Sequence, residues 1–193
     1  MQFEIPSLRP FTLEDVLSII SGYETQEIYT VGKTESDIQT IFDIHLVNLE
    51  NAYRASYYED FNPEDLQRYQ GLVSQGYAFG AYQMDELVAF ALGEAFPQER
   101  LLRVWEFHVK DELRRKGVGR ALMEQVITKA QQDQFAMILL ETQNTNVQAV
   151  RFYRRLGFTI HAIDLSHYSD LGGAEASQVA FFMKRRLESS STI

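Results

Sequence analysis

The stretch that decides the fold is Arg114-Arg115-Lys116-Gly117-Val118-Gly119-Arg120-Ala121-Leu122. It joins an apolar, strand-like segment at 101–109 to a helix-like segment at 118–132. Its two glycines let the main chain approach a ligand closely at the point where a strand is followed by a helix. The first N–H groups of that helix have no partner inside it, and they lie at the positive end of its dipole. With the basic side chains beside them, they predict a site for the pyrophosphate of a cofactor.

A solvated basic turn, whose glycines serve only chain reversal, is the alternative interpretation of this stretch. The stretch is not a Walker phosphate loop, because no Gly-Lys-Ser/Thr follows the glycines. It also departs from the dinucleotide fingerprint, since Leu122 stands where a third glycine would allow close helix packing. The pattern that remains is Arg114-x-x-Gly117-x-Gly119.

This spacing after a strand resembles the acetyl-coenzyme A pyrophosphate loop of the GNAT N-acetyltransferase superfamily. A second block, at 146–158, is similar to that family's Asn-x-x-Ala-x-x-x-Tyr-x-x-x-Gly-Phe segment and lies in the expected order downstream. The C-terminal half is most similar to the streptothricin acetyltransferase branch. That closer likeness depends on Leu140-Glu141-Thr142-Gln143, Asp164, Tyr168 and Val179-Ala180-Phe181-Phe182.

Composition and charge limit the classes of function. At 193 residues, with 45% hydrophobic and 23% charged residues, the chain fits one globular domain spanning 1–193. The absence of cysteine excludes disulfides, thiolate zinc sites and an acyl-cysteine intermediate, so direct transfer is the simplest scheme for an acyltransferase. A net charge of −9 argues against nucleic acid or an anionic membrane as partner and suits a cationic acceptor, although an acidic surface also serves plain solubility.

Other general features concern location, metals and assembly. No basic segment precedes an apolar core at 1–6, so no signal peptide is expected and a cytoplasmic location is predicted. The four histidines show no tight ligand spacing, so no metal site is predicted. A homodimer is left open as an oligomeric state.

The order of elements predicts an α/β (α+β) fold with a mixed, mostly antiparallel sheet flanked by helices, as the resemblance also implies. Strands are expected at 3–10, 77–83, 87–96, 101–109, 135–140, 158–165 and 178–187. Helices are expected after Thr12, after Asn62-Pro63, over 118–132 and after Thr145, with a capping box between Thr145 and Gln148.

Within the segment from Tyr23 to Gly76, helices are also expected over 38–45 and 46–53. Apolar side chains recur there at helical spacing, in Ile38, Ile41 and Phe42 with His45, and again in Leu46, Leu49 and Tyr53. The resemblance implies that this part of the chain helps to form the acceptor pocket. Its aromatic residues either line that pocket or pack as core; they are Tyr53, Tyr57, Tyr58 and Phe61.

The resemblance implies a set of cofactor-binding residues. The pyrophosphate is expected on the N–H groups of 116–120, flanked by Arg114 and Arg115, and Asn146 is expected to contact the pantetheine arm unless it only caps a helix. Arg151, Arg154 and Arg155 either approach the adenosine phosphate or form a solvated helix face. The full set is Phe107, His108, Val109, Arg114, Arg115, Lys116, Gly117, Val118, Gly119, Arg120, Ala121, Asn146 and Tyr153.

Transfer of an acetyl group from a thioester to an amine requires a base, an oxyanion site and an acid. Glu106 is the candidate base, expected on one face of its strand with Val104 and His108; an ion pair with Arg103 is the alternative, and His108 is the alternate base. The streptothricin branch tends to carry two adjacent acids where this chain has Trp105-Glu106, which weakens the assignment.

The remaining two roles come from the resemblance. It implies that the main-chain N–H of Val109 stabilises the oxyanion and that the phenol of Tyr153 protonates the leaving thiolate. A purely structural core tyrosine is the alternative for Tyr153.

The sequence therefore predicts an N-acetyltransferase that moves acetyl from acetyl-CoA directly to a primary amine. A small cationic acceptor is favoured, with a streptothricin-like antibiotic, and hence antibiotic resistance, as the specific hypothesis. Two rivals stay open: an acetyltransferase for peptide N-termini or protein lysines, and a non-catalytic acyl-CoA-binding regulatory module.

Overall fold

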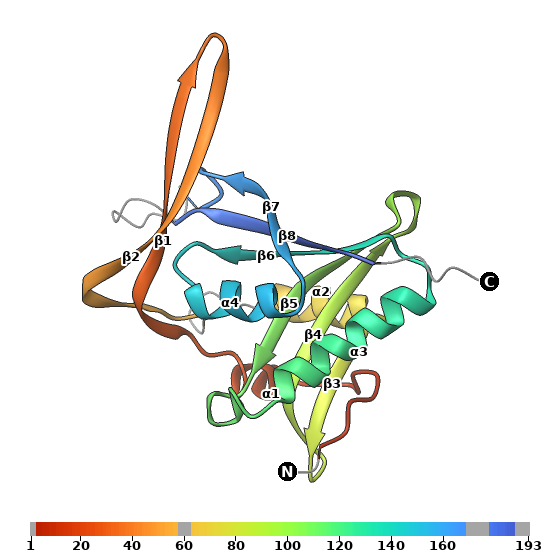
Figure 1. Ribbon diagram of the computed structural model, residues 1–193. Coiled ribbons are helices and arrows are strands. Elements are labelled where there is room, and N and C mark those ends of the chain that lie inside the picture. Colours follow the sequence, from red (N-terminus) through yellow and green to blue (C-terminus); the bar gives the residue numbers. More distant parts are fainter. Residues whose placement is uncertain (1–2, 58–62, 169–177, 188–193) are drawn as a thin grey trace. The chain divides into compact units, whose positions relative to one another are not determined.

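The computed structural model describes residues 3–57, 63–168 and 178–187 (Figure 1). The helices and strands are α1 (Leu13–Leu17), β1 (Tyr23–Ser36), β2 (Gln39–Ala55), α2 (Pro63–Val73), β3 (Ala78–Gln83), β4 (Glu86–Phe96), β5 (Leu101–Val109), α3 (Val118–Gln132), β6 (Met137–Gln143), α4 (Val147–Arg155), β7 (Thr159–Asp164) and β8 (Ala180–Arg186). Strands β1 and β2 form a two-stranded sheet. The other six form a sheet with the order β3-β4-β5-β6-β8-β7. The predicted mixed, mostly antiparallel α/β architecture is confirmed.

The chain divides into two compact units. Within the described residues, the first unit comprises 3–22, 56–57, 63–140 and 185–187, and the second comprises 23–55, 141–168 and 178–184. None of the helices in the described ranges is long and apolar enough to cross a membrane.

The first unit is built on the antiparallel strands β3, β4 and β5, with β6 parallel to β5. β3 and β4 are joined by a tight turn in which Met84 and Asp85 both have positive φ, as two-residue hairpins require. Helix α3 contacts β3, β4 and β5, and α2 contacts β4. Fully buried side chains form the core around them: Phe90, Leu92, Leu102, Leu122, Met123 and Ile138. The strands expected at 77–83, 87–96 and 101–109 and the helix at 118–132 are confirmed within a residue or two.

A β-bulge in β5 changes the predicted faces of this strand. Leu92 pairs with Glu106 and Gly93 pairs with Val104, so Trp105 is one extra residue opposite β4. Paired residues share a face of a sheet, whereas Leu92 and Gly93 lie on opposite faces. Glu106 and Val104 therefore lie on opposite faces, and the expectation that they share one was wrong. The strict period of two fails because the bulge shifts the alternation by one residue.

The ladder between β5 and β6 is short. It joins 101–104 to 137–140 in parallel, as expected for strands linked by a helical crossover. β5 continues beyond this ladder through 105–109, paired with β4. This extension carries the predicted base Glu106, the alternate base His108 and the predicted oxyanion donor Val109.

The second unit contains the largest departure from the predicted elements. Residues 23–55 form a long antiparallel hairpin, not helices (Figure 1). Its register places Tyr29 opposite Leu46 and Val31 opposite Ile44, so apolar side chains face one another across the two strands. The apparent helical spacing at 38–45 combines residues from two elements: Ile38 lies in the turn of the hairpin, and Ile41 and Phe42 lie in β2.

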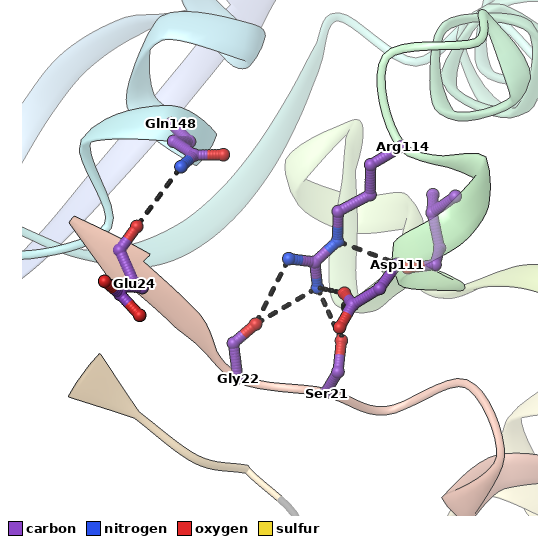
Figure 2. A network of polar contacts seen from close by, with 7 residues as sticks. Ser21, Gly22, Glu24, Asp111, Arg114 and Gln148 are labelled. Carbon is purple, nitrogen blue, oxygen red and sulfur yellow. Dashed lines mark hydrogen bonds and ion pairs between the residues drawn. The ribbon is translucent and has the colours of Figure 1, made fainter.

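The remainder of the second unit contains β7, β8 and α4. Its core includes the fully buried Phe158, Phe181 and Met183. The capping box expected for α4 is wrong: Asn146 is the N-cap, Thr145 hydrogen bonds with the Tyr23 hydroxyl at 2.6 Å, and Gln148 donates to Glu24 O at 3.3 Å (Figure 2).

The outcome for the chain ends is mixed. The strand expected at 3–10 is reduced to two isolated bridges to β3, through Glu4 and Ser7. The capping box of α1, formed by Thr12 and Asp15, confirms the predicted helix start there. Three residues with a predicted role lie outside the described residues: Asn62, the expected helix cap, and Tyr58 and Phe61, the expected pocket or core aromatics.

Candidate active site

The glycine loop places free main-chain amides at the start of α3. Gly117 is the N-cap of α3 with φ +90°, and a Cβ at this position would meet no atom within 4 Å. Arg115 also has positive φ, at 60°. A glycine is therefore required at 117 by its backbone conformation, and the space beside it is open.

The hydrogen bonds of the loop decide which of its amides can bind an anion. The first bond of the helical ladder runs from Ala121 N–H to Gly117 O, at 3.0 Å. The amides of 117–120 thus precede the ladder and point out of the helix N-terminus. The N–H of Lys116, which was predicted to hold the pyrophosphate together with those of 117–120, instead donates to Leu113 O at 3.3 Å. The helix-start amides available to an anion are those of Gly117, Val118, Gly119 and Arg120.

The four basic side chains of the loop differ in their surroundings. Arg114 is half-buried and bonded to the protein, and Arg120 pairs with Glu124 at 2.7 Å within α3. Arg115 and Lys116 are exposed. The positive field at the helix start therefore comes mainly from Arg115, Lys116 and the helix dipole.

Glu106 lies in a cluster of polar and aromatic side chains within the first unit. Its Oε2 is 2.9 Å from Nε2 of His108, and the exposed fractions of the two side chains are 24% and 14%. The hydroxyl of Tyr69, on α2, also hydrogen bonds with Glu106. Burial, and then the charge and hydrogen bond of this carboxylate, raise the pKa of Tyr69. Glu106 can accept a proton and pass it to His108, because the two side chains are joined by a hydrogen bond.

Two arginines lie beside the ring of Trp105, which precedes Glu106, and the alternative ion pair between Glu106 and Arg103 stays a prediction. The guanidinium of Arg103 lies 3.4 Å from the ring centroid of Trp105, with that of Arg68 at 4.2 Å. The indole N–H donates to Glu94 at 2.6 Å. The ring of Trp105 thus contacts two guanidinium groups, and Glu106 is hydrogen-bonded to His108 and Tyr69.

The end of β5 presents main-chain groups on the edge away from β4. Lys110 N–H donates to Val88 O at 3.0 Å. Because hydrogen-bonded and non-hydrogen-bonded pairs alternate in an antiparallel ladder, the N–H and C=O of the preceding Val109 point to the opposite edge. The Nε of Arg114 lies 3.4 Å from Val109 O on that edge. The predicted oxyanion donor is therefore directed away from β4.

Tyr153 and Asn146 belong to the second unit. Tyr153 is 7% exposed on α4, with ring centroids of Phe152 and Phe158 at 5.3 Å and 5.8 Å. The Oδ1 of Asn146 accepts a hydrogen bond from Ala149 N–H at 3.1 Å, as a helix cap does. Asn146 thus has the structural role that was the alternative, and its predicted pantetheine contact stays a prediction. The same holds for the acid role of Tyr153.

The arginines of α4 are engaged within the second unit. Arg151 forms two hydrogen bonds to Glu27, at 2.6 Å and 3.0 Å, which lower the pKa of that carboxyl. Arg154 lies over the ring of Tyr29 and donates to its hydroxyl. These contacts show how Arg151 and Arg154 hold the base of the hairpin to α4.

The sequence patterns did not point to two buried residues with polar contacts, Tyr69 in the first unit and Asn144 in the second. Asn144 is 1% exposed, and its amide donates to Tyr29 O at 2.7 Å and accepts from Val179 N–H at 2.8 Å. Its own main chain bonds the same two residues. Asn144 therefore fixes β1 and the start of β8 immediately before the helix cap at Asn146. An amide directly after an apolar strand was the signal available in the sequence.

Comparison with known proteins identifies the family of this chain. The model of the Acetyltransferase (GNAT) family matches residues 46–158. The chain belongs to this family. The match covers both motif blocks and the Glu106 strand, and it confirms the predicted superfamily and fold.

Individual relatives agree with the family match. Streptothricin acetyltransferase A of Bacillus subtilis (strain 168) is 38% identical over 74 residues, which are 38% of this chain and 42% of that relative's length. The crystal structure of a nourseothricin acetyltransferase has a TM-score of 0.76 at 24% identity and covers 96% of this chain and 99% of its own. A putative streptothricin acetyltransferase from Bacillus anthracis str. Ames, solved in complex with acetyl coenzyme A, has a TM-score of 0.74 at 20% identity, with 97% and 100% covered. At these identities the solved structures show the common fold.

Proposed function

We propose that this protein is an acetyl-CoA-dependent N-acetyltransferase that acts on a primary amine of a small, cationic acceptor. The observation that carries the proposal is the set of amides at 117–120, which precede the hydrogen-bond ladder of α3 beside an N-cap glycine with φ +90°. Such a set binds two linked phosphates without requiring a particular side chain. Membership of the GNAT family supports acetyl-CoA as the molecule that carries those phosphates.

Each candidate residue has a role in a direct transfer. Glu106 accepts the proton that the incoming ammonium must lose, with Tyr69 and His108 holding its carboxylate in place. The amine then forms a C–N bond to the thioester carbonyl, whose oxygen gains negative charge that the N–H of Val109 stabilises. As the C–S bond breaks, the Tyr153 hydroxyl gives its proton to the leaving sulfur. The new amide nitrogen releases a proton, which returns Tyr153 to its neutral form, and Glu106 gives the proton it accepted to solvent.

The acceptor is proposed from charge and from the relatives. A net charge of −9 attracts a cationic molecule. The names of relatives as streptothricin and nourseothricin acetyltransferases support a streptothricin-type antibiotic as the acceptor.

An assay of CoA thiol release tests the proposal with three classes of acceptor. These are a streptothricin-type antibiotic, polyamines such as spermidine, and peptides with free N-termini or lysines. The proposal expects turnover on the first class with the highest kcat/KM. Turnover confined to peptides would replace the acceptor class, and CoA binding without turnover on any amine would leave only a binding module.

A further inference from the structure

Arg114, the first residue of the glycine motif, directs its side chain away from the helix start (Figure 2). Its guanidinium contacts Gly22 O at 3.1 Å and 3.2 Å, Ser21 Oγ at 2.7 Å and Asp111 Oδ1 at 3.0 Å. Its Nε lies 3.4 Å from Val109 O. All three guanidinium nitrogens are thus engaged with the protein. The carboxylate of Asp111 also neutralises the positive charge of the Arg114 guanidinium, which would otherwise attract a phosphate.

The groups that Arg114 holds have definite places in the fold. Val109 is the last residue of β5, and Gly22 is the last residue of the first unit before β1 begins at Tyr23. Ser21 also donates to Asp111 at 2.7 Å, which closes a ring of polar contacts among the three segments. The side chain of Arg114 therefore connects the glycine motif to the end of β5 and to Gly22, where the chain leaves the first unit.

Arg115 provides the contrast within the same motif. Arg115 carries the same guanidinium group, but its main chain has a positive φ and its side chain is exposed. A positive charge on an exposed side chain next to the free amides is suited to attract phosphates. A guanidinium bonded to main-chain carbonyls is suited to fix a backbone.

We propose that Arg114 is a positioning residue: it fixes the main chain of Val109 and the Ser21–Gly22 segment, whereas Arg115 and the amides of 117–120 meet the phosphates. This inference rests on the proposed function. It predicts that loss of Arg114 lowers the rate of transfer because the peptide that carries the oxyanion donor is no longer held. It also predicts that the affinity for CoA changes little.

The test compares Arg114→Gln with the matched control Arg115→Gln, using two donors. One donor is acetyl-CoA; the other is acetyl-pantetheine, which has the same thioester but no pyrophosphate. Arg114→Gln is expected to lower kcat by about 10- to 100-fold with both donors, with the Kd of CoA within about twofold of wild type. Arg115→Gln is expected to raise the Kd of CoA and to lower kcat/KM with acetyl-CoA only. A defect of Arg114→Gln that disappears with acetyl-pantetheine would make Arg114 a phosphate ligand and overturn the proposal, as would wild-type kinetics.

A second variant serves if Arg114→Gln does not fold. Ser21→Ala leaves the guanidinium intact and removes one of its acceptors together with the bond to Asp111. Ser21→Ala is expected to lower kcat with both donors, by a smaller factor than Arg114→Gln does. A Ser21→Ala enzyme with unchanged kcat would contradict the proposal.

Hydrogen exchange separates this inference from the proposed function. If no amine is acetylated by the wild type, the proposed function fails, but the connection made by Arg114 can still be measured. Amides at 18–25 are expected to exchange faster in Arg114→Gln and at the wild-type rate in Arg115→Gln. Equal exchange in both variants would show that Arg114 fixes nothing there.

Discussion

The glycine loop at 114–121 and the hairpin β1–β2 at 23–55 show opposite relations between sequence and structure. The loop follows from local requirements: a positive φ at Gly117 and a helix N-terminus whose amides precede the ladder. The hairpin is held by pairs such as Val31 with Ile44, whose partners are far apart in sequence. Ile38, in its turn, is 91% exposed. The loop should therefore be sensitive to single substitutions, and the hairpin tip should not.

The largest expected effect extends the comparison to the second motif block, which was also identified from spacing. Tyr153→Phe keeps the ring that packs against Phe152 and Phe158 but removes the hydroxyl. We expect kcat to fall by about 10²- to 10⁴-fold, because general acid catalysis is lost, with little change in the Kd of acetyl-CoA. Steady-state kinetics with calorimetry measures both. An unchanged kcat would remove Tyr153 from the mechanism.

Gly117→Ala tests the loop itself. Its Cβ would meet no atom within 4 Å, so the cost arises from placing an L-residue at φ +90°. We expect the free energy of unfolding to fall by about 1–2 kcal/mol, and the Kd of CoA to rise because the amides are displaced.

The matched control for that variant is Gly71→Ala in α2. A Cβ there also meets no atom within 4 Å, and its φ is not positive. Alanine is favoured over glycine in a helix, so we expect stability to rise by about 0.5–1 kcal/mol. Urea unfolding of both variants measures the two signs. Equal signs would mean that the backbone of Gly117 is not the constraint.

The far end of α3 gives a smaller, pH-dependent effect. Asp133 accepts hydrogen bonds from Lys129 and Tyr77, which lower the pKa of its carboxyl below the usual 3.8. A carboxyl with a lowered pKa in the folded state stabilises the protein above its unfolded pKa, and this contribution is lost as pH falls through the folded value. Asp133→Asn should thus cost about 1 kcal/mol or less near neutral pH, and this cost should disappear as the pH falls below 3.8 and through the lowered pKa. Urea unfolding as a function of pH measures this; a cost that stays constant down to low pH would contradict the assignment.

The smallest effect is expected at the hairpin tip. Ile38→Ser removes an apolar side chain that is already in water, so the free energy of unfolding should change by less than about 0.5 kcal/mol. The kcat on a small amine should be unchanged. Thermal unfolding and steady-state kinetics check both, and a large loss of either would show that the tip is as constrained as the loop.

The sequence predicted features that short-range rules determine. Helix α3, the parallel β5–β6 crossover and the N-cap glycine follow from periodicity and from the conformational freedom of glycine. It did not predict the bulge at Trp105, which moved Val104 to the other face of β5 from Glu106. A bulge depends on how a strand fits its neighbour, and no residue type marks it.

Contacts between segments that are distant in the sequence could not be predicted either. The contacts of Arg114 with Ser21 and Gly22 could not be predicted, because these two residues lie about 90 positions earlier in the chain. The bond between Tyr69 and Glu106 likewise depends on how α2 packs on the sheet. The roles of Glu106 and Tyr153 in catalysis stay predictions from chemistry and resemblance.

The most direct test is a ¹⁵N–¹H NMR titration of the protein with CoA and, separately, with pantetheine. If the amides of 117–120 hold the pyrophosphate, their resonances will shift strongly with CoA and much less with pantetheine, and the amide of Lys116, bonded to Leu113 O, will shift less than theirs. Equal shifts with the two ligands, or no shift at 117–120 while CoA binds, would contradict the account.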